Sequence, residues 1–548
     1  MKRISLLVAA VITSTVVFTQ TSWEMAYNVI QTNCSGCHTS GHESGLDLSG
    51  SISVVYDNLY DVNPTNPVSL AKGYKRVSPG NPYQSFIFSK INNSLALDVN
   101  LEAGEGIACP QGASPLNNKD IELIRQWILF GAKESDYLVD IALINDFYDN
   151  DGIQSITSPP APPPPGEGFQ VHFGPFFLWP ETEHEYWLKY PTNIPEASEI
   201  IRIETFMGDY SHHFITYKFT TPEIGATAVP GLHDLAIVDI FNTVMVSANQ
   251  NSYNLELPEN TALFWDANTV LDLNSHYLNY SAEKSEACEA YINIYTQPAG
   301  TAIQEMIPTL LSDDGFYIPN DGIPYTHDAS VYDNSADPEE EVFLWSATSH
   351  THRHGTDFDI YMRNPDGSKG EHIFDASCGA TEGIPGCLDE IYDYKHPPVR
   401  YWESMKPVKP KNGLIYSATW VNEEDHDLFF GLTSEDEMQV IWYMYVEDTT
   451  GLNLPVSIDQ VSGEEESINI FPNPAHNSIY INSDINLTGF LFTITDLTGS
   501  ILKEQISNTE NSSSNYYQID VSGFVPGVYL VNIISPDGLM FSKKIIIQ

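Results

Sequence analysis

A proline-rich run divides this chain, and it constrains the possible folds more than any other feature. Residues 158–166 read Ser-Pro-Pro-Ala-Pro-Pro-Pro-Pro-Gly. Proline lacks a backbone N–H and fixes φ, so the run can continue neither a helix nor an inner strand of a sheet. It favours a stiff, extended polyproline spacer instead. We therefore expect a linker at residues 151–168, with separately folded domains on either side of it.

The sequence patterns on the two sides of this linker differ. Before it, residues 21–150 end in an amphipathic helix, in which Asn117 can cap the start and Ile121 and Ile124 share one face. After it, short runs rich in Ile, Val, Tyr, Phe and Trp are bounded by turn residues, which is typical of strands. We expect a multidomain chain: a small all-α domain at 21–150, two mainly antiparallel, jelly-roll-like β-sandwiches at 169–310 and 311–450, a linker at 451–467, and a small β-sandwich at 468–548.

The net charge excludes one class of partner. Lys and Arg total 24 against 73 Asp and Glu, which gives a formal net charge of −49. Proteins bind nucleic acids largely through Lys and Arg contacts to phosphate, so no nucleic-acid partner is expected. Hydrophobic residues make up 42% of the chain, which is enough apolar material for packed domains and argues against wholesale disorder.

The N-terminus has the pattern of an export signal. Lys2 and Arg3 precede an apolar run at residues 4–18, in the order of the charged and hydrophobic regions of a signal peptide. The run is short for a membrane span, although an N-terminal anchor is the alternative. We predict a signal peptide at residues 1–20 and transit through the periplasm, where disulfides persist.

A haem-attachment pattern follows in the first domain. Cys34-Ser-Gly-Cys37-His38 is C-x-x-C-H, in which two thiols can add to the haem vinyl groups and the histidine can bind the iron. A thioredoxin-like pair would need a βαβ context, and a zinc site would need further ligands, of which only His42 is near. We predict one covalently bound c-type haem on Cys34, Cys37 and His38.

The first domain resembles a class I-like cytochrome c. The resemblance rests on the haem motif, on Ser-Pro-Gly-Asn-Pro at 78–82 followed by Phe-Ile-Phe-Ser-Lys-Ile, and on a last helix that ends Trp127-Ile-Leu-Phe-Gly-Ala. Members of that family usually carry a Met before the last helix as the distal iron ligand, but residues 39–150 contain no Met. The distal position is therefore left to Cys109, to His42 or to no protein ligand.

Histidines cluster in the β-rich part of the chain. In order, the clusters are Tyr210-Ser-His212-His213, Asn274-Ser-His276-Tyr277, Ser349-His350-Thr-His352 and Asp436-Glu437-Met438. His350 and His352 are two apart, so on a strand both rings point to one face and can chelate one metal. His212 and His213 are adjacent, so binding one metal together needs a bulge or a strand end. Imidazole combined with a Met thioether suits copper.

In this order, and across residues 167–450, the clusters resemble the type II copper monooxygenases, the peptidylglycine α-hydroxylating and dopamine β-monooxygenases. The resemblance implies two copper sites: His212, His213 and His276 at an electron-storing copper, and His350, His352 and Met438 at the catalytic copper where O2 binds. It implies an enzyme that hydroxylates a C–H bond of a small organic substrate with O2. An ascorbate-type donor supplies electrons in that family, and the fusion suggests the haem as the donor here.

Three positions depart from the peptide-amidating members of the family. Those members hold the substrate carboxylate with an Arg, an Asn and a Tyr, and the matching residues here are Thr348, Val440 and Trp442. None of them pairs with a carboxylate as Arg does, so we do not expect a glycine-extended peptide as substrate. Trp442 favours an apolar or cationic group near the oxygen site. The alternatives are a non-catalytic surface protein that uses the same metals for electron transfer or binding, and a binding sandwich with incidental histidines.

Four cysteines lie outside the haem motif: Cys109, Cys288, Cys378 and Cys387. Cys378 and Cys387 flank a glycine-containing loop, so a local disulfide is the simplest pairing. The monooxygenase resemblance implies a bridging cysteine at Cys288, for which Cys109 is one possible partner. Three pairings of the four residues remain open.

The last part of the chain resembles the type IX secretion sorting domain of Bacteroidetes. The motifs that carry the resemblance are Phe-Pro-Asn-Pro-Ala at 471–475, Thr495-Asp-Leu-Thr-Gly499, Pro-Gly-Val-Tyr-Leu at 526–530 and the terminal Lys-Lys-Ile-Ile-Ile-Gln. The resemblance implies recognition by the type IX secretion machinery and a final location at the cell surface or outside the cell. The alternative is an ordinary β-sandwich binding module.

Overall fold

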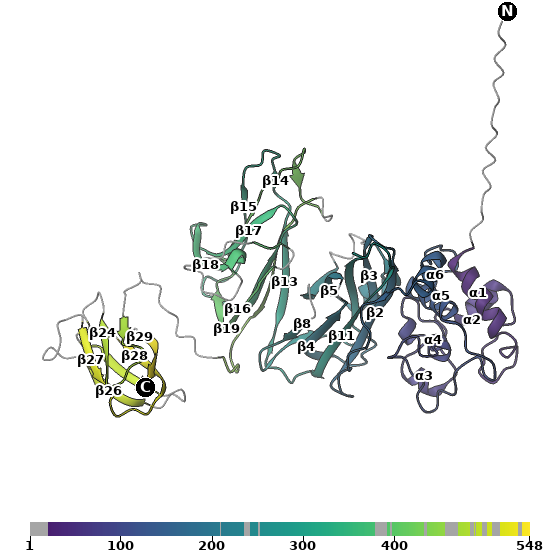
Figure 1. Ribbon diagram of the computed structural model, residues 1–548, viewed down its shortest axis with the longest axis horizontal. Helices are drawn as coiled ribbons and strands as arrows, with labels where there is room; N and C mark the ends of the chain where they lie inside the picture. Colours follow the sequence, from purple (N-terminus) through teal and green to yellow (C-terminus); the bar gives the residue numbers. More distant parts are fainter. Residues whose placement is uncertain are drawn as a thin grey trace, which may run out of the picture. The chain divides into compact units, whose positions relative to one another are not determined.

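Figure 1 shows the chain as a computed structural model, coloured from the N-terminus in purple to the C-terminus in yellow. The chain forms two compact units, Met1–Leu454 and Pro455–Gln548. The structure describes residues 20–208, 210–234, 242–249, 253–378, 392–394, 397–431, 436–454, 469–482, 487, 489–495, 501–506, 516–534 and 540–548. The predicted signal peptide therefore lies almost wholly outside the described residues.

The first unit begins with helices that occupy residues 22–149, purple to blue in Figure 1. They are α1 (Ser22–Asn33), α2 (Ile52–Leu59), α3 (Pro67–Ala71), the 3₁₀ turn η1 (Pro82–Gln84), α4 (Phe86–Ile91), α5 (Asn118–Leu129) and α6 (Ile141–Asp149). The side chains of Thr21 and Asn117 cap α1 and α5. Trp23 of α1 packs against Trp127 of α5, with ring centroids 4.8 Å apart, and both are buried. That this helical segment is a cytochrome c-like domain stays a prediction.

Two sheets follow and form the first sandwich. One sheet has the order β1-β11-β4-β9-β12, with β2 on β11 and β8 on β4, and the other has the order β6-β3-β10-β5-β7. The strands are β1 (Ile153–Gln154), β2 (Gly168–Leu178), β3 (Glu183–Pro191), β4 (Ser198–Met207), β5 (Ser211–Phe219), β6 (Gly231–His233), β7 (Thr243–Asn249), β8 (Tyr253–Glu256), β9 (Thr261–Trp265), β10 (Val270–Leu278), β11 (Glu286–Pro298) and β12 (Gln304–Glu305), with the short helix α7 (Pro222–Thr227) after β5. Only the β1–β11 and β9–β12 pairs are parallel among the strands described here.

The helical segment and the first sandwich share one hydrophobic core. Glycine allows their backbones to meet. A Cβ on Gly231 would lie 2.3 Å from the amide N of Gly131, and a Cβ on Gly80 would lie 2.3 Å from the amide N of Gly231. The proline-rich run lies against the sheet, where the Pro160 carbonyl accepts a 3.1 Å hydrogen bond from the Gln170 side chain. The run therefore lies within one compact unit, and the domain boundary expected at this place stays a prediction.

Two further sheets form the second sandwich, which has its own core. Their orders are β13-β22-β16-β19 and β15-β20-β17-β18, with β14 and β21 as a separate pair. The strands are β13 (Ile307–Asp313), β14 (Tyr317–Ile318), β15 (Tyr325–Val331), β16 (Val342–His350), β17 (Gly355–Arg363), β18 (Lys369–Asp375), β19 (Val399–Val408), β20 (Leu414–Trp420), β21 (Leu428–Phe429) and β22 (Gln439–Val446), with a 3₁₀ turn η2 (Ala376–Cys378) after β18.

The second unit is a small antiparallel β fold. It has the sheets β23-β24-β27 and β26-β25-β28-β29, with a core between them. The strands are β23 (Asn469–Phe471), β24 (Ser478–Asn482), β25 (Leu491–Thr495), β26 (Ile501–Ile506), β27 (Tyr516–Asp520), β28 (Gly527–Ile534) and β29 (Met540–Ile547). The prediction of several mainly antiparallel β domains is thus confirmed.

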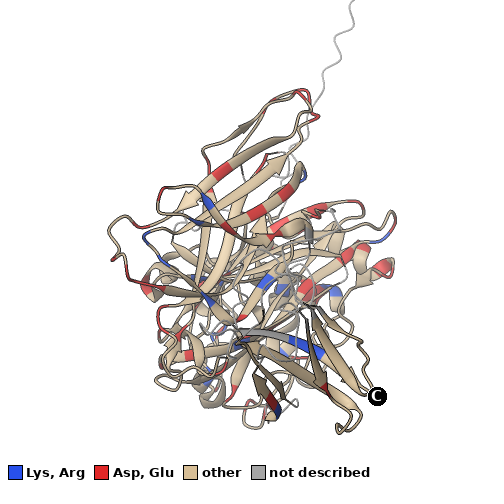
Figure 2. Cartoon of the chain, turned by 90° about the vertical axis from the view of Figure 1, so that its left-hand side faces the viewer, with Lys and Arg blue, Asp and Glu red and all other residues tan. Residues whose placement is uncertain are grey.

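Acidic residues are spread over the fold. Figure 2 shows Asp and Glu on strands, helices and loops, with far fewer Lys and Arg among them. A surface of this kind keeps a protein soluble through mutual repulsion. Within the described part of the chain, none of the helices has both the length and the apolar character that crossing a membrane requires.

Candidate metal sites

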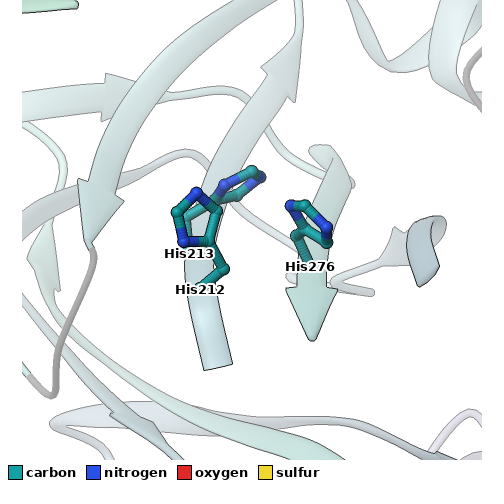
Figure 3. Close-up of side chains that lie close together, drawn as sticks. All are labelled: His212, His213 and His276. Carbon is teal, nitrogen blue, oxygen red and sulfur yellow. The ribbon is translucent and has the colours of Figure 1, made fainter. Parts of the chain in front are cut away.

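Three histidines from neighbouring strands converge in the first sandwich. His212 and His213 lie on β5 and His276 lies on β10. One ring nitrogen from each lies within 4.8 Å of the others, and Figure 3 shows the three rings gathered together. The β5–β10 register shifts at this point, since His276 faces His213 while Tyr277 faces Ser211. His212 is therefore the extra residue of a bulge, which supplies the distortion that two adjacent histidines need in order to face one metal.

The environment of this three-His group keeps His276 neutral. The pKa of His276 is lowered to about 4, mainly by burial and then by the neighbouring His213 and His212, because like charges repel. Neutral imidazole is the form that binds a metal ion. Three imidazole nitrogens at this separation fit a copper ion, for which imidazole is a suitable ligand.

Glu185 on β3 supports the three-His group, and the sequence analysis missed it. His213 Nε2 lies 2.8 Å from Asn274 Oδ1 and 3.3 Å from Glu185 Oε1, and the Asn274 side-chain amide donates to the same Glu185 oxygen at 2.7 Å. Burial acts to raise the pKa of Glu185, but its hydrogen bond and charge interaction with His213 outweigh this and lower the pKa to about 2. The Nε2–H of His213 thus donates, and Nδ1 keeps the lone pair for a metal.

His350 and His352 approach each other in the second sandwich. Their ring centroids are 5.2 Å apart and their planes are nearly perpendicular. β16 ends at His350, so His352 lies in the turn to β17 and not on the strand that the spacing predicted. In this turn the Gly355 N–H donates to the His352 carbonyl at 3.1 Å. The tight turn therefore brings the His350 and His352 rings together, whereas the spacing predicted that both rings would lie on one face of a strand.

The pKa values of this pair favour the neutral form. The pKa of His350 is lowered to about 3, mainly by burial and then by His352, His213 and His212. The two histidine groups are therefore close enough for their charges to interact. Burial also lowers the pKa of His352, whose Nδ1 lies 2.9 Å from the Asp436 carbonyl oxygen. Because a carbonyl only accepts, Nδ1 carries the proton and Nε2 keeps the lone pair.

Glu437 ties the segment that carries Met438 to the histidine turn. It is fully buried, and it accepts hydrogen bonds from the backbone N–H of His352 at 2.9 Å, of His354 at 2.8 Å and of Met438 at 3.4 Å. The Trp420 indole N–H donates to it as well, at 2.9 Å. Burial raises the pKa of Glu437 to about 7, and these N–H donors oppose that rise. The carboxylate therefore fixes the backbone on both sides of the candidate copper ligands.

The haem motif occupies the turn that follows α1. The N–H groups of Cys37 and His38 both donate to the Cys34 carbonyl, at 3.2 and 3.1 Å, so the motif is a single compact turn. His38 Nδ1 lies 3.2 Å from Ser44 Oγ, and Cys37 is exposed. Both thiols and the imidazole thus belong to one surface turn, which fits the attachment of a c-type haem.

Cys109 and His42 both lie near this turn. The pKa of Cys34 is raised to about 11, mainly by burial and then by the charges of Cys109 and Cys37. The His42 and His38 ring centroids are 4.7 Å apart. Both predicted candidates for the distal position are therefore neighbours of the motif.

The cysteines of the described residues are free thiols: Cys34, Cys37, Cys109 and Cys288. Cys288 is buried on β11. The proposed pair of Cys378 and Cys387 falls outside the residues whose side chains are described. A bridge between Cys109 and Cys288 is therefore not formed in this structure.

Trp442 does not lie where the sequence suggested. Its side chain is buried on β22 and its indole N–H donates to the Met245 carbonyl of the first sandwich at 3.3 Å. The ring fills the shared core, so it cannot also line an open substrate site. Thr348 donates its hydroxyl to the Pro398 carbonyl at 2.7 Å, and Val440 is buried, so the matching positions offer no charge for a carboxylate.

One other group of possible metal ligands occurs among the described residues: Asp359, His372 and Asp375. His372 Nε2 lies 2.6 Å from Asp359 Oδ1, and the His372 ring stacks on Tyr361. Burial lowers the pKa of His372, but its hydrogen bond and charge interaction with Asp359 outweigh this and raise it. An ion pair accounts for this arrangement without a metal.

Comparison with known proteins assigns the C-terminal unit. Residues 469–548 match the family described as the secretion system C-terminal sorting domain. The protein is therefore exported, and it is attached to the cell surface or extracellular. The machinery that such a domain addresses is the type IX secretion system.

The remaining comparisons are weak, and no curated protein matches the chain. PorZ, a surface component of the type IX secretion system of Porphyromonas gingivalis, is 17% identical over 19% of this chain and 14% of its own, with a TM-score of 0.13. A β-1,2-glucanase from Parabacteroides distasonis is 11% identical over 44% of this chain and 36% of its own, with a TM-score of 0.14. PNGase F from Flavobacterium meningosepticum is 12% identical over 52% of this chain and 98% of its own, with a TM-score of 0.20. These scores are too low to support an inference.

Proposed function

We propose that this exported protein is a copper-dependent monooxygenase that carries a c-type haem and hydroxylates a C–H bond of a small organic substrate with O2. The observation that carries the proposal is the convergence of His212, His213 and His276 at a β-bulge, within 4.8 Å of one another. These three histidines come from two separate segments of the chain, and the resemblance to the type II copper monooxygenases assigns them to one copper. A convergence that requires a local irregularity in the sheet is not expected of incidental histidines.

The ligand sets suit the proposed metal. The three-His group would hold the electron-storing copper, and His350 and His352 with Met438 would hold the catalytic copper. Copper, when bound, supplies one-electron redox chemistry with O2 at these positions. Burial keeps His276 and His350 neutral, so their lone pairs are available to a metal at neutral pH.

Outer groups orient the ligand rings. Glu185 and Asn274 hold the proton of His213 on Nε2, and the Asp436 carbonyl holds that of His352 on Nδ1. Such partners commonly fix the tautomer and direction of metal-binding histidines. The His213 and His352 rings would therefore need little reorientation when a metal enters.

The helical segment would supply electrons. Cys34, Cys37 and His38 are the residues that would attach and ligate the haem, whose iron supplies one-electron reduction. The segment shares a core with the first sandwich, so donor and acceptor would lie in one compact unit. The substrate would not be anchored through a carboxylate, because Thr348, Val440 and Trp442 offer no cation.

The first test is the metal content of the mature, full-length protein. We expect two copper ions per chain by elemental analysis and one covalent haem by its pyridine spectrum. The variant His276→Ala should lose one copper, while the matched variant His327→Ala should keep both, since the His327 ring pairs with Asp313 at 3.1 Å and belongs to neither proposed ligand set. Haem without copper after reconstitution would contradict the proposal.

A second measurement separates catalysis from electron transfer. Substrates are screened for O2 uptake coupled to formation of an alcohol, with the wild type and with Met438→Ala. We expect product formation to be lost in Met438→Ala, because the thioether would no longer hold the catalytic copper. Two coppers and one haem without any O2-dependent product would favour the alternative, a surface protein that binds copper and haem for electron transfer.

A further inference from the structure

A buried histidine joins the helical segment to the first sandwich. His172 on β2 is stacked between two tyrosine rings, with centroids 4.0 Å away on each side and planes tilted by 20° and 26°. Tyr83 belongs to η1 of the helical segment, and Tyr291 belongs to β11 of the sandwich. The three rings therefore cross the boundary between the two parts without a gap.

Both nitrogens of His172 are bonded to carboxylates. Nδ1 lies 2.8 Å from Asp98 Oδ2 of the helical segment, and Nε2 lies 2.9 Å from Glu289 Oε2 on β11. Burial would lower the pKa of His172, but the two carboxylates outweigh it and raise the pKa. A carboxylate on each nitrogen requires both to donate, so the ring is an imidazolium. Burying such a triad is costly, which makes it a poor choice for stability alone.

The contacts continue from Glu289 to the three-His group. The Tyr277 hydroxyl donates to the Glu289 carbonyl oxygen and accepts from the Gly208 N–H at 3.2 Å. Tyr277 is fully buried on β10, directly after His276. From His172 to His276, every step is therefore a hydrogen bond or a covalent bond.

On the other side, α4 connects the stack to the haem motif. The Tyr83 ring meets the buried Phe88 ring of α4 edge to face, at 6.0 Å between centroids. Near the end of the same helix, the Lys90 carbonyl accepts a hydrogen bond from the Cys109 N–H at 2.8 Å. A helix of six residues thus spans the distance from the stack to the neighbourhood of the haem motif.

We propose that Tyr83, His172, Glu289 and Tyr277, which we call the His172 junction, form the route by which electrons pass from the haem segment to the three-His group. This inference rests on the proposed function, because it assigns a donor and an acceptor to those two places. One electron leaves Fe(II), which becomes Fe(III), and reduces Cu(II) to Cu(I); no proton or other group moves. The residues of the junction act as a packed, hydrogen-bonded medium for tunnelling and are not themselves oxidised.

The test follows the haem in the full-length protein loaded with haem and Cu(II), without O2. The haem is reduced by a light pulse through a flavin donor, and its reoxidation is recorded by absorbance. Tyr277→Phe keeps the aromatic ring but loses the hydrogen bond to the Glu289 carbonyl. We expect the haem to be reoxidised at least about tenfold more slowly in this variant, which corresponds to about 1.4 kcal/mol in the apparent activation free energy. Tyr295→Phe is the matched control, since Tyr295 of β11 loses a hydroxyl bond to Glu204 of β4, which is not part of the route.

A second variant tests the histidine itself. His172→Ala should slow reoxidation by at least as much, while His372→Ala should not, although His372 is likewise stacked on a tyrosine and paired with an aspartate. Hydrogen exchange of the cofactor-free chain shows whether His172→Ala has opened the boundary at residues 80–88. Tyr277→Phe should leave that exchange unchanged, so a slower rate in this variant reports the route and not a loosened interface.

Each outcome decides the proposal. Wild-type rates in both Tyr277→Phe and His172→Ala would overturn the route, and the proposed monooxygenase would stand. Equal slowing by the Tyr295→Phe control would overturn it as well. A wild-type haem that stays reduced beside bound Cu(II) would exclude electron transfer along any route. Ascorbate-driven hydroxylation could then still be measured, so the failure of the route and the failure of the proposed function are distinguishable.

Discussion

The buried carboxylate of Glu437 offers the sharpest test of how the second candidate copper site is built. Glu437→Gln keeps the shape of the side chain but replaces one acceptor oxygen with an amide NH2. Both oxygens are in use, because Oε1 accepts from the His354 N–H and Oε2 accepts from the His352 and Trp420 N–H groups. Whichever way the amide is turned, at least one buried N–H then faces another donor.

The cost can be worked out from this count. A buried donor left without an acceptor costs about 1–3 kcal/mol. If the turn at residues 350–356 opens locally, this cost makes its backbone amides exchange with solvent roughly 5- to 150-fold faster. Glu437→Ala removes the acceptor for every donor, so its effect should exceed that of Glu437→Gln. The faster exchange would result from the loss of the acceptor for these N–H groups and not from a change in copper chemistry. The measurement is therefore made on the copper-free chain.

The assay is hydrogen exchange measured by mass spectrometry on peptides that cover residues 350–356. Glu424→Gln is the matched control, because Glu424 pairs with Arg353 of the same turn at 3.0 Å but is partly exposed. An exposed ion pair of this kind contributes at most about 1 kcal/mol and often nothing measurable. Unchanged exchange in Glu437→Gln, or an equally large change in Glu424→Gln, would refute the reasoning.

Three further predictions concern the other groups. Glu185→Gln should weaken copper binding at the three-His group by about 10- to 100-fold in a chelator competition, because the proton of His213 loses its charged acceptor; unchanged affinity would show that Asn274 alone orients the ring. Cys37→Ser should leave a haem attached through one thioether, with a shifted pyridine spectrum, and an unshifted spectrum would contradict the motif. The pKa of His172 is raised in the folded chain, so its protonation stabilises the fold. This stabilisation is complete below the unfolded pKa of 6.5 and is lost as pH rises through the folded pKa. The melting temperature of the cofactor-free chain should therefore fall above pH 6.5, and it should fall less in His172→Gln.

Sequence patterns identified the residues of the candidate sites better than they identified the geometry. His212, His213 and His276 could be selected because the order of the histidine clusters along the chain resembles that of a copper-enzyme family. How they meet could not be predicted, since the bulge depends on the register between β5 and β10. The strand expected to carry both His350 and His352 ends at His350, because the turn to β17 starts one residue later.

The supporting residues carried no sequence signal at all. Glu185 and His172 are single polar residues on strands, a pattern that is far more often a solvent-exposed side chain. Their partners come from distant positions, such as Asp98 and Glu289 for His172. Only the folded chain brings such groups together, whereas the type IX sorting motifs are local and could be recognised from the sequence.

The glycine contacts between the helical segment and the first sandwich bear on how this protein could be engineered. Gly80, Gly131 and Gly231 leave no room for any side chain where the two backbones meet. The helical segment therefore cannot be replaced by another redox domain through a junction placed in the proline run. A replacement would need glycine at the same places, and either half expressed alone would expose the apolar surface that the shared core now covers. Truncated versions should be made at residues 455–468, where the first compact unit ends.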